Sequence, residues 1–197
     1  MRENRTSVAE QSSHCLDEAG TLRADAKLRC DSRYKIRDSS PGAPMPSSLT
    51  VRPVTRADYD QWLPLWDGYN TFYGRSGPTA LAPEITQMTW ARFFDGYEPM
   101  HALVAESDGK LVGLVHYLFH RNTTMLGPVC YLQDLFTDAS QRGKGVGKAL
   151  IEAVYEKAKA AGSPRVYWHT NATNHTAMKL YNYVADHSGF VVYRKDL

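Results

Sequence analysis

The sequence predicts an α/β domain with one mixed sheet of about six strands, flanked by about four helices. Segments with strand character alternate with segments in which apolar residues recur every three or four positions, as on one face of a helix. Their predicted order is β–α–α–β–β–β–α–β–α–β. Asp108 and Gly109 separate two of the strands and indicate a hairpin, because this pair tolerates the positive φ of a tight turn.

The composition is that of a globular domain with a tail. Of 197 residues, 43% are apolar and 22% are charged, which are ordinary values. The net charge of +2 gives no strong attraction to nucleic acid or membrane, so we expect neither as a partner. No apolar run is long enough to span a bilayer or to form a signal-peptide core. Cys15, Cys30 and Cys130 lack metal-site spacing, so we expect reduced thiols in a cytoplasmic protein that could also enter the nucleus.

Residues 1–48 differ in character from the rest of the chain. They mix charges of both signs, contain few large apolar residues, and end in a stretch rich in serine and proline over residues 39–48. Such a composition is typical of a linker. We therefore expect a flexible extension over residues 1–48 and one folded domain over residues 49–197.

The first half of the expected domain contains a strand, two helices and the hairpin. A strand over residues 49–54 leads to a helix with Asp58 as its N-cap. Helical spacing relates the apolar residues Trp62, Leu65, Trp66 and Tyr69. A second helix is expected over residues 83–94, and the hairpin strands over residues 101–106 and 111–118.

The second half contains the clearest helix of the chain, which follows a strand over residues 131–137. Its apolar face would consist of Val146, Ala149, Leu150, Ala153 and Val154. A strand over residues 165–170, a helix capped by Thr173 or Asn174, and a final strand over residues 190–194 follow.

The loop before the clearest helix is the strongest functional signal. Gly143, Gly145 and Gly147 stand at alternate positions among cationic residues, and the helix begins at once. Bare backbone N–H groups at a helix N-terminus, where the macrodipole favours negative charge, form a seat for a phosphate or pyrophosphate.

The spacing of this loop excludes two common phosphate motifs. A P-loop needs glycine where Arg142 stands and a hydroxyl where Ala149 stands. The dinucleotide fingerprint needs its last glycine where Lys148 or Leu150 stands. The pattern that fits is Arg142-x-x-Gly145-x-Gly147.

This pattern resembles the acetyl-CoA loop of the GNAT superfamily of N-acetyltransferases, Gln/Arg-x-x-Gly-x-Gly/Ala between a strand and a helix. The segment from Asn174 to Tyr181, followed by Gly189-Phe190, resembles the family's Asn-x-x-Ala-x-x-Leu-Tyr and Gly-Phe motifs. The resemblance covers about residues 49–197, and it implies the GNAT fold, in which the sheet splays near the cofactor strand.

Two further features are similar to the histone, polyamine and D-amino-acid acetyltransferase subgroup. Diamine and polyamine enzymes carry an acidic pair where this chain has Gln133 and Asp134, so one of the two acids is missing here. Extra residues over 182–188 resemble an insertion of the same subgroup.

The resemblance implies that acetyl-CoA is the co-substrate, bound mainly by backbone. Amides from Arg142 to Lys148 would hold the diphosphate. Pantetheine would add to the strand edge at Leu135 and Thr137, with a nearby N–H polarising the thioester carbonyl. Lys144 and Lys148 could equally be solvated surface lysines. The expected cofactor-binding residues are Leu135, Phe136, Thr137, Arg142, Gly143, Lys144, Gly145, Val146, Gly147, Lys148 and Asn174.

The resemblance also implies catalytic roles, each with a structural alternative. Tyr181 matches the general acid that protonates the leaving thiolate, although periodicity alone would make it a core residue; Tyr183 is off-register. Asp134, an acid in an apolar strand, is expected to bind or deprotonate the amine, or else to satisfy loop N–H groups. Gln133 could orient the substrate. Asn174 could contact coenzyme A or only cap its helix.

The expected reaction is direct transfer of an acetyl group to a polyamine, an amino acid or a protein lysine. No enzyme cysteine is required, and Cys130 would precede its strand. We expect a homodimer or tetramer, joined through residues 190–194, and no metal. A sensor of acetyl-CoA without turnover is one alternative. Another is a metal-regulated transferase that uses His116 and His120, which lie on one face of a strand, with His101 or His169.

Overall fold

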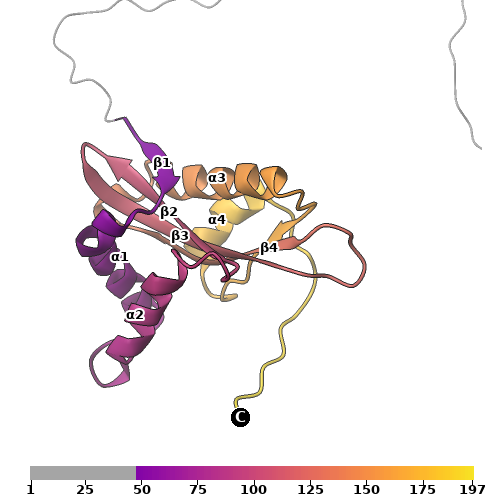
Figure 1. Ribbon diagram of the computed structural model, residues 1–197, viewed down its shortest axis with the longest axis horizontal. Coiled ribbons are helices and arrows are strands. Elements are labelled where there is room, and N and C mark those ends of the chain that lie inside the picture. The colour runs from indigo at the N-terminus through magenta and orange to yellow at the C-terminus, as the bar shows by residue number, and fades with distance from the viewer. Residues whose placement is uncertain (1–47) are drawn as a thin grey trace, which may run out of the picture. The chain divides into compact units, whose positions relative to one another are not determined.

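The structure is a computed structural model that describes residues 48–197, so the extension expected over residues 1–48 lies outside the described residues except for Ser48. These residues form a five-stranded mixed sheet in the order β1-β2-β3-β4-β5 (Figure 1). Its strands are β1 (Thr50–Pro53), β2 (Met100–Ser107), β3 (Lys110–His120), β4 (Val129–Thr137) and β5 (Val166–Tyr167). The first four strands pair antiparallel, and β5 pairs parallel with β4.

Helices cover both faces of the sheet. They are α1 (Tyr59–Phe72), α2 (Pro83–Arg92), α3 (Val146–Ala160) and α4 (His175–Val184). Leu114 belongs to an apolar cluster with the side chains of α1, whereas its neighbour Val115 belongs to a second cluster with those of α3. Since adjacent strand residues face opposite ways, α1 and α3 pack on opposite faces. The predicted α/β fold with four helices is confirmed, with one strand fewer than expected.

The hairpin is confirmed, and two other elements differ from expectation. Asp108 and Gly109 have φ of 51° and 76°, as a tight β2–β3 turn requires. The strand expected over residues 165–170 is only Val166–Tyr167. Residues 190–194 form no strand, and Phe190 and Tyr193 are 88% and 93% exposed. β-Propensity reports how well a side chain fits a half-buried sheet surface, so a strand-like segment without a neighbouring edge stays unpaired.

A β-bulge interrupts the pairing of β3 with β4. Asp134 lies opposite His116 and Leu132 lies opposite Tyr117, so Gln133 is an extra residue in β4. Asp134 is buried and Gln133 is exposed. Bulges bend a strand and re-aim its side chains. Beyond Tyr131, β4 has no partner in β5, and this open edge is the splay that the resemblance implied.

Asp58 is the N-cap residue of α1, as expected, but its side chain makes no capping hydrogen bond. A short 3₁₀ turn, Arg56–Asp58, precedes the helix. The Asp58 carboxylate instead accepts hydrogen bonds from both terminal nitrogens of Arg52, at 2.8 and 2.9 Å, and from the backbone N–H of Thr55 at 2.7 Å. The hydrogen bonds from Arg52 lower the pKa of Asp58 to about 2, against the opposing effect of burial. This ion pair ties β1 to the start of α1.

We expect Asp58→Asn to lower the free energy of unfolding by roughly 2 kcal/mol at neutral pH. The pKa of Asp58 is lower in the folded chain than its ordinary 3.8, so the stabilisation is complete above about pH 4. It is lost as the pH falls through about 2. Urea unfolding of both proteins at pH 7, 4 and 3 measures this. Glu106→Gln, which alters the more exposed partner of Arg52, is the control and should lower the free energy of unfolding by less. A deficit in Asp58→Asn that did not shrink below pH 4 would contradict the assignment.

Candidate active site

The glycine loop holds a left-handed backbone at two positions. Gly143 and Gly145 have φ of 76° and 86°, and Gly145 is the N-cap of α3. L-residues with a side chain rarely adopt this conformation. The next residue, Val146, is 3% exposed and anchors the first turn of α3 in the core. The loop is therefore fixed at its junction with the helix while its glycines face solvent.

The backbone amides of this loop lack acceptors within residues 48–197. The amide of Gln141 donates to Asp138 O at 2.9 Å, and that of Ala149 donates to Gly145 O at 3.0 Å. Between them, the amides of residues 143–148 have no hydrogen bond to any described residue. They include the first turn of α3, whose dipole adds partial positive charge. An anion is the ligand that such a turn favours.

The cations of the loop have different surroundings. Lys144 Nζ donates to Gln141 Oε1 at 3.0 Å, and Lys148 Nζ lies 3.2 Å from Glu152 Oε1. Both contacts suit surface lysines, the alternative that the sequence left open. Arg142 is exposed and stacks over the ring of Phe136 at 6.0 Å. A Cβ at Gly147 would lie 3.3 Å from the Leu180 side chain, so this glycine lets α3 approach α4.

The open edge of β4 lies next to this loop. Leu135, Phe136 and Thr137 pair with β3 on one edge and with no described strand on the other. The ring of Phe136 is half-buried and packs against α1, where a Cβ at Gly68 would come within 2.7 Å of it. The backbone of Phe136 remains open to a ligand along the free edge of β4. Leu135 packs on the α3 side.

A chain of buried hydrogen bonds ends at Asp134. Trp62 Nε1 donates to His116 Nε2 at 3.1 Å, and His116 Nδ1 lies 3.0 Å from Asp134 Oδ2. An indole N–H can only donate, so His116 Nε2 must accept and Nδ1 must carry the proton that is donated to Asp134. The side chains of His116 and Asp134 are 1% and 7% exposed. The arrangement fixes the tautomer of His116 and the orientation of the carboxylate.

Tyrosines surround the Asp134 carboxylate. Burial raises the pKa of Tyr69 far above its ordinary value, and the negative charge of Asp134 and its hydrogen bond with the phenol act in the same direction. Burial and then Asp134 also raise the pKa of Tyr73 and of Tyr131. The sequence placed Tyr69 on an aromatic helix expected to be mostly core, with lining of the acceptor pocket as the alternative, and did not single out the other two. The only signal for Tyr73 is its helical i, i+4 spacing from Tyr69.

Tyr181 lies on α4 and packs against the apolar cluster on the α3 side of the sheet. It is half-buried, and its ring meets that of Trp168 edge-on at 5.4 Å. Burial, with a smaller effect of Tyr73, raises the pKa of Tyr181 to about 12. The charge of Asp134 affects the pKa of Tyr73, and Tyr73 affects that of Tyr181, so these two sequence-predicted residues lie within electrostatic range of the same tyrosine. Tyr183 is 75% exposed and lies outside it.

Asn174 caps α4. Its Oδ1 accepts a hydrogen bond from the Ala177 N–H at 3.4 Å, and its Nδ2 donates to Thr170 Oγ1 at 3.2 Å. The sequence predicted that Cys130 precedes its strand, and this was wrong. β4 begins at Val129, so Cys130 lies within it. The Cys130 thiol is buried, and burial raises its pKa to about 12.

The candidate metal-binding histidines do not converge. Both ring nitrogens of His116 are engaged by Trp62 and Asp134. His120 pairs with Arg121 O and the Tyr167 hydroxyl, at 2.9 and 3.0 Å. Within residues 48–197, no group of three or more His, Cys, Asp or Glu side chains is arranged to hold a metal ion.

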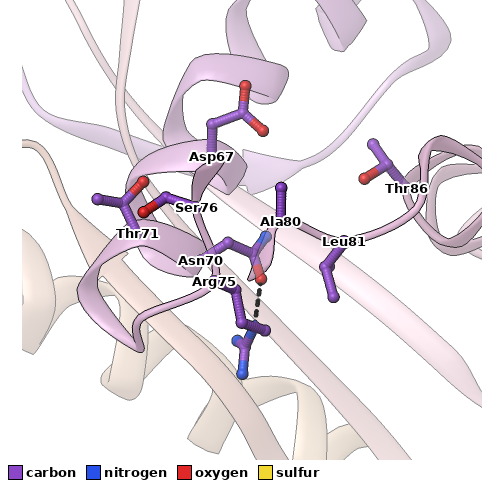
Figure 2. Close-up of a pocket in the computed structure, with 8 residues that line it drawn as sticks. All are labelled: Asp67, Asn70, Thr71, Arg75, Ser76, Ala80, Leu81 and Thr86. Atoms are coloured by element: carbon purple, nitrogen blue, oxygen red, sulfur yellow. Dashed lines mark hydrogen bonds between the residues drawn. The ribbon is translucent and has the colours of Figure 1, made fainter. Parts of the chain in front are cut away.

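A pocket of about 260 Å³ opens beside the tyrosines, between the end of α1 and the start of α2 (Figure 2). Its lining residues are Asp67, Asn70, Thr71, Arg75, Ser76, Ala80, Leu81 and Thr86. Arg75 both lines this pocket and lies over the rings of Tyr69 and Tyr73, 5.5 Å from each centroid. The pocket therefore adjoins the tyrosine cluster around Asp134.

The fold defines the class of protein, an α/β domain in which a run of unpartnered backbone amides at a helix N-terminus lies beside an open strand edge. The sequence profile of the Acetyltransferase (GNAT) family matches residues 62–183, and the chain belongs to this family. It is 35% identical over 150 residues to the D-amino-acid N-acetyltransferase HPA3 of Saccharomyces cerevisiae, an alignment that covers 75% of this chain and 91% of that protein. No helix in residues 48–197 is long and apolar enough to cross a membrane.

Solved structures agree in fold. The aminoglycoside N-acetyltransferase AAC(6')-Iy in complex with CoA superposes with a TM-score of 0.64 at 19% identity, covering 78% of this chain and 98% of that one. A ribosomal-protein-alanine N-acetyltransferase from Brucella melitensis gives a TM-score of 0.62 at 21% identity, covering 76% and 99%.

We expect the His116 ring to be protonated at Nδ1 and not at Nε2. Long-range ¹H–¹⁵N spectra of the imidazoles at pH 7.5 distinguish these tautomers. Trp62→Phe removes the donor to Nε2 and should introduce the Nε2–H tautomer, because that nitrogen can then carry a proton. Trp90→Phe, which alters another ring of the same aromatic cluster, is the control and should keep the Nδ1–H tautomer. An Nε2–H signal from His116 in the unaltered protein would refute the hydrogen-bond chain.

Proposed function

We propose that this protein is an acetyl-CoA-dependent N-acetyltransferase that moves the acetyl group directly to a primary amine in a ternary complex. The observation that carries the proposal is the run of unpartnered amides at residues 143–148 beside the open edge of β4. Both features suit coenzyme A, which has a diphosphate and an amide-bearing pantetheine arm. The neighbour AAC(6')-Iy in complex with CoA supports the choice of cofactor.

In the proposed complex, the diphosphate accepts hydrogen bonds from amides between Arg142 and Lys148. The pantetheine arm extends along Leu135, Phe136 and Thr137 and bonds to their backbone as an added strand would. The thioester then lies near Leu135, where a backbone N–H stabilises the oxyanion that forms when the carbonyl is attacked. Asn174 lies at the N-terminus of α4 as a further polar contact for the cofactor.

The amine acceptor binds at Asp134 in this proposal. The carboxylate is held in one orientation by His116, and the surrounding phenols keep their protons because their pKa values are raised. Asp134 is therefore the anionic group of the site and suits a substrate ammonium. It accepts the proton of the ammonium directly or through water, so that the neutral amine can attack. Gln133, exposed beside it, is in reach to orient the substrate.

Tyr181 supplies the proton that the leaving group needs. With a pKa of about 12, its phenol stays protonated at neutral pH, so it can donate to the thiolate of coenzyme A as the C–S bond breaks. The C–N bond forms as the C–S bond breaks, so the acetyl group passes directly from sulfur to nitrogen and no acyl-enzyme is needed. After Asp134 has taken the proton of the ammonium, the attacking amine loses one further proton, which replaces the proton that Tyr181 gives to the thiolate. The Cys130 thiol, with its raised pKa, lacks the activation of a nucleophile.

The acceptor is a polyamine, an amino acid or a protein lysine. The name of the yeast relative HPA3 supports small amines such as D-amino acids. A sensor without turnover would not need Tyr181, so its presence at the site favours an enzyme. A metal-regulated transferase would need a nitrogen of His116, and both of them are engaged. We also propose a cytoplasmic location, in line with the unpaired thiol of Cys130.

Turnover of acetyl-CoA with a panel of amines, measured by thiol release, tests the proposal. Tyr181→Phe should lower kcat at least roughly tenfold, a typical scale for losing a general acid, and leave acetyl-CoA binding by calorimetry near normal. Tyr183→Phe makes the same change on an exposed ring of α4 and should keep kcat. Unchanged turnover in Tyr181→Phe would refute its role, and failure to bind acetyl-CoA or to release thiol with any amine would refute the function.

We propose that the protein forms a homodimer or tetramer through residues 190–194. Phe190, Val191, Val192 and Tyr193 are each at least 64% exposed, and such an apolar run favours burial against another surface. Light scattering should give a mass of two or four chains. Val191→Asp combined with Tyr193→Asp should shift the mass toward one chain, whereas Lys195→Asp combined with Leu197→Asp should not. A monomer before any substitution would sink this part of the proposal.

A further inference from the structure

Arg75 is held in one orientation by a buried residue. Its backbone N–H donates to Asn70 O at 2.9 Å, and its Nε donates to Asn70 Oδ1 at 2.7 Å (Figure 2). Asn70 is 4% exposed, and its amide donates to Trp66 O at 2.9 Å. Fixing a long cationic side chain in this way costs conformational entropy. The arrangement therefore points to a use for the guanidinium.

The outer edge of the Arg75 guanidinium is available. Among the described residues 48–197, its two terminal nitrogens have no hydrogen bond and no ion pair, although Nε is engaged. An arginine that is bonded only through Nε still presents two parallel N–H donors, one from each terminal nitrogen. A carboxylate can accept hydrogen bonds from both of them at once. The same side chain lines the 260 Å³ pocket, so a small ligand can reach it.

Arg75 and Asp134 act on the same two phenols with opposite sign. The negative charge of Asp134 favours the protonated forms of Tyr69 and Tyr73, and the positive charge of Arg75 opposes it. The guanidinium lies 5.5 Å from the centroid of each ring. A carboxylate held by His116 and a guanidinium held by Asn70 thus both lie near one tyrosine pair. A ligand that matches both must carry a cation and an anion close together.

We propose that the acceptor is a free amino acid, whose carboxylate is bound by Arg75 while its amine lies at Asp134. This inference rests on the proposed acetyl transfer and narrows its substrate class. A polyamine offers only cations and would bring a second positive charge toward Arg75. The pocket that Arg75 lines has Ala80 and Leu81 in its wall and would receive the side chain of the amino acid. Its volume lies below the ~300 Å³ at which pockets for drug-sized ligands begin, which suits a small molecule.

Matched acceptors with and without the carboxylate test this inference. Both enantiomers of phenylalanine and leucine are compared with phenylethylamine and isopentylamine, the same amines without the carboxylate. The unaltered protein should show a kcat/KM at least tenfold higher for the better enantiomer of each amino acid. Arg75→Met should lower this kcat/KM by roughly 10- to 100-fold, mainly through KM, since a charge-assisted bidentate contact is lost. The kcat/KM of Arg75→Met for the two plain amines should stay within about twofold of that of the unaltered protein.

The controls separate binding from folding. Arg165→Met changes the same residue type at an exposed position before β5. It should leave kcat/KM unchanged for both classes of acceptor. Arg75→Lys keeps the charge but loses the two parallel N–H donors. Its kcat/KM for the amino acids should therefore lie between those of the unaltered protein and of Arg75→Met. The comparison of acceptors on the unaltered protein needs no variant and stands even where Arg75→Met does not fold.

Two results would overturn the inference alone. One is a kcat/KM for a plain amine that equals that for the matching amino acid. The other is an Arg75→Met variant in which kcat/KM falls equally for the amino acids and the plain amines. Each leaves acetyl transfer intact, so the proposed function would survive. Absence of thiol release with every acceptor would instead overturn the function, and the assignment of Arg75 with it.

Discussion

The bulge at Gln133 is the constraint on which the site depends. In an uninterrupted ladder Gln133 would lie opposite His116 and Asp134 opposite Val115, whose side chain belongs to the apolar cluster on the α3 face. A carboxylate there would be buried without a partner, which is costly. The extra residue brings Asp134 to the α1 face, where His116 donates to it. The pairing of β4 with β5 ends at Tyr131, just before this bulge, and the edge beyond it stays open.

The anion-binding turn depends on how firmly the core holds α3. Val146, Leu150 and Ile151 are each at most 3% exposed, so the first turn of α3 cannot move without opening the apolar cluster on that face of the sheet. The loop amides that precede it are left to solvent, where water can satisfy them until a ligand takes its place. A rigid set of donors does not have to be reorganised on binding, which favours affinity for an anion.

The sequence predicted the glycine loop and α3 better than the surroundings of Asp134, for a physical reason. Alternating glycines before an amphipathic helix are a local pattern, and the loop and α3 lie where that pattern predicts. The tyrosines around Asp134 come from α1, its C-terminal end and β4, and only the fold brings them together. Helical periodicity gave Tyr69 a core role, which it also has. The bulge depends on the pairing between β3 and β4, so neither strand sequence alone could predict it. Residues 190–194 have β-propensity but no neighbouring strand edge, so the sequence predicted a strand there that does not form.

The charges along the open edge of β4 are arranged with opposite sign at its two ends. At one end, loop amides, the α3 dipole and Arg142 favour an anion; at the other, Asp134 favours a cation. The open strand edge beyond Asp134 consists of Leu135, Phe136 and Thr137, about 10 Å of extended chain. In the proposed mechanism this polarity orients both substrates, because an anionic cofactor and a cationic amine each have one favourable end. The acetyl group then has to lie between them, beside the backbone of Leu135 and within the region that Tyr181 borders. With an amino acid as the acceptor, a carboxylate held by Arg75 would fix the amine in the direction of the thioester.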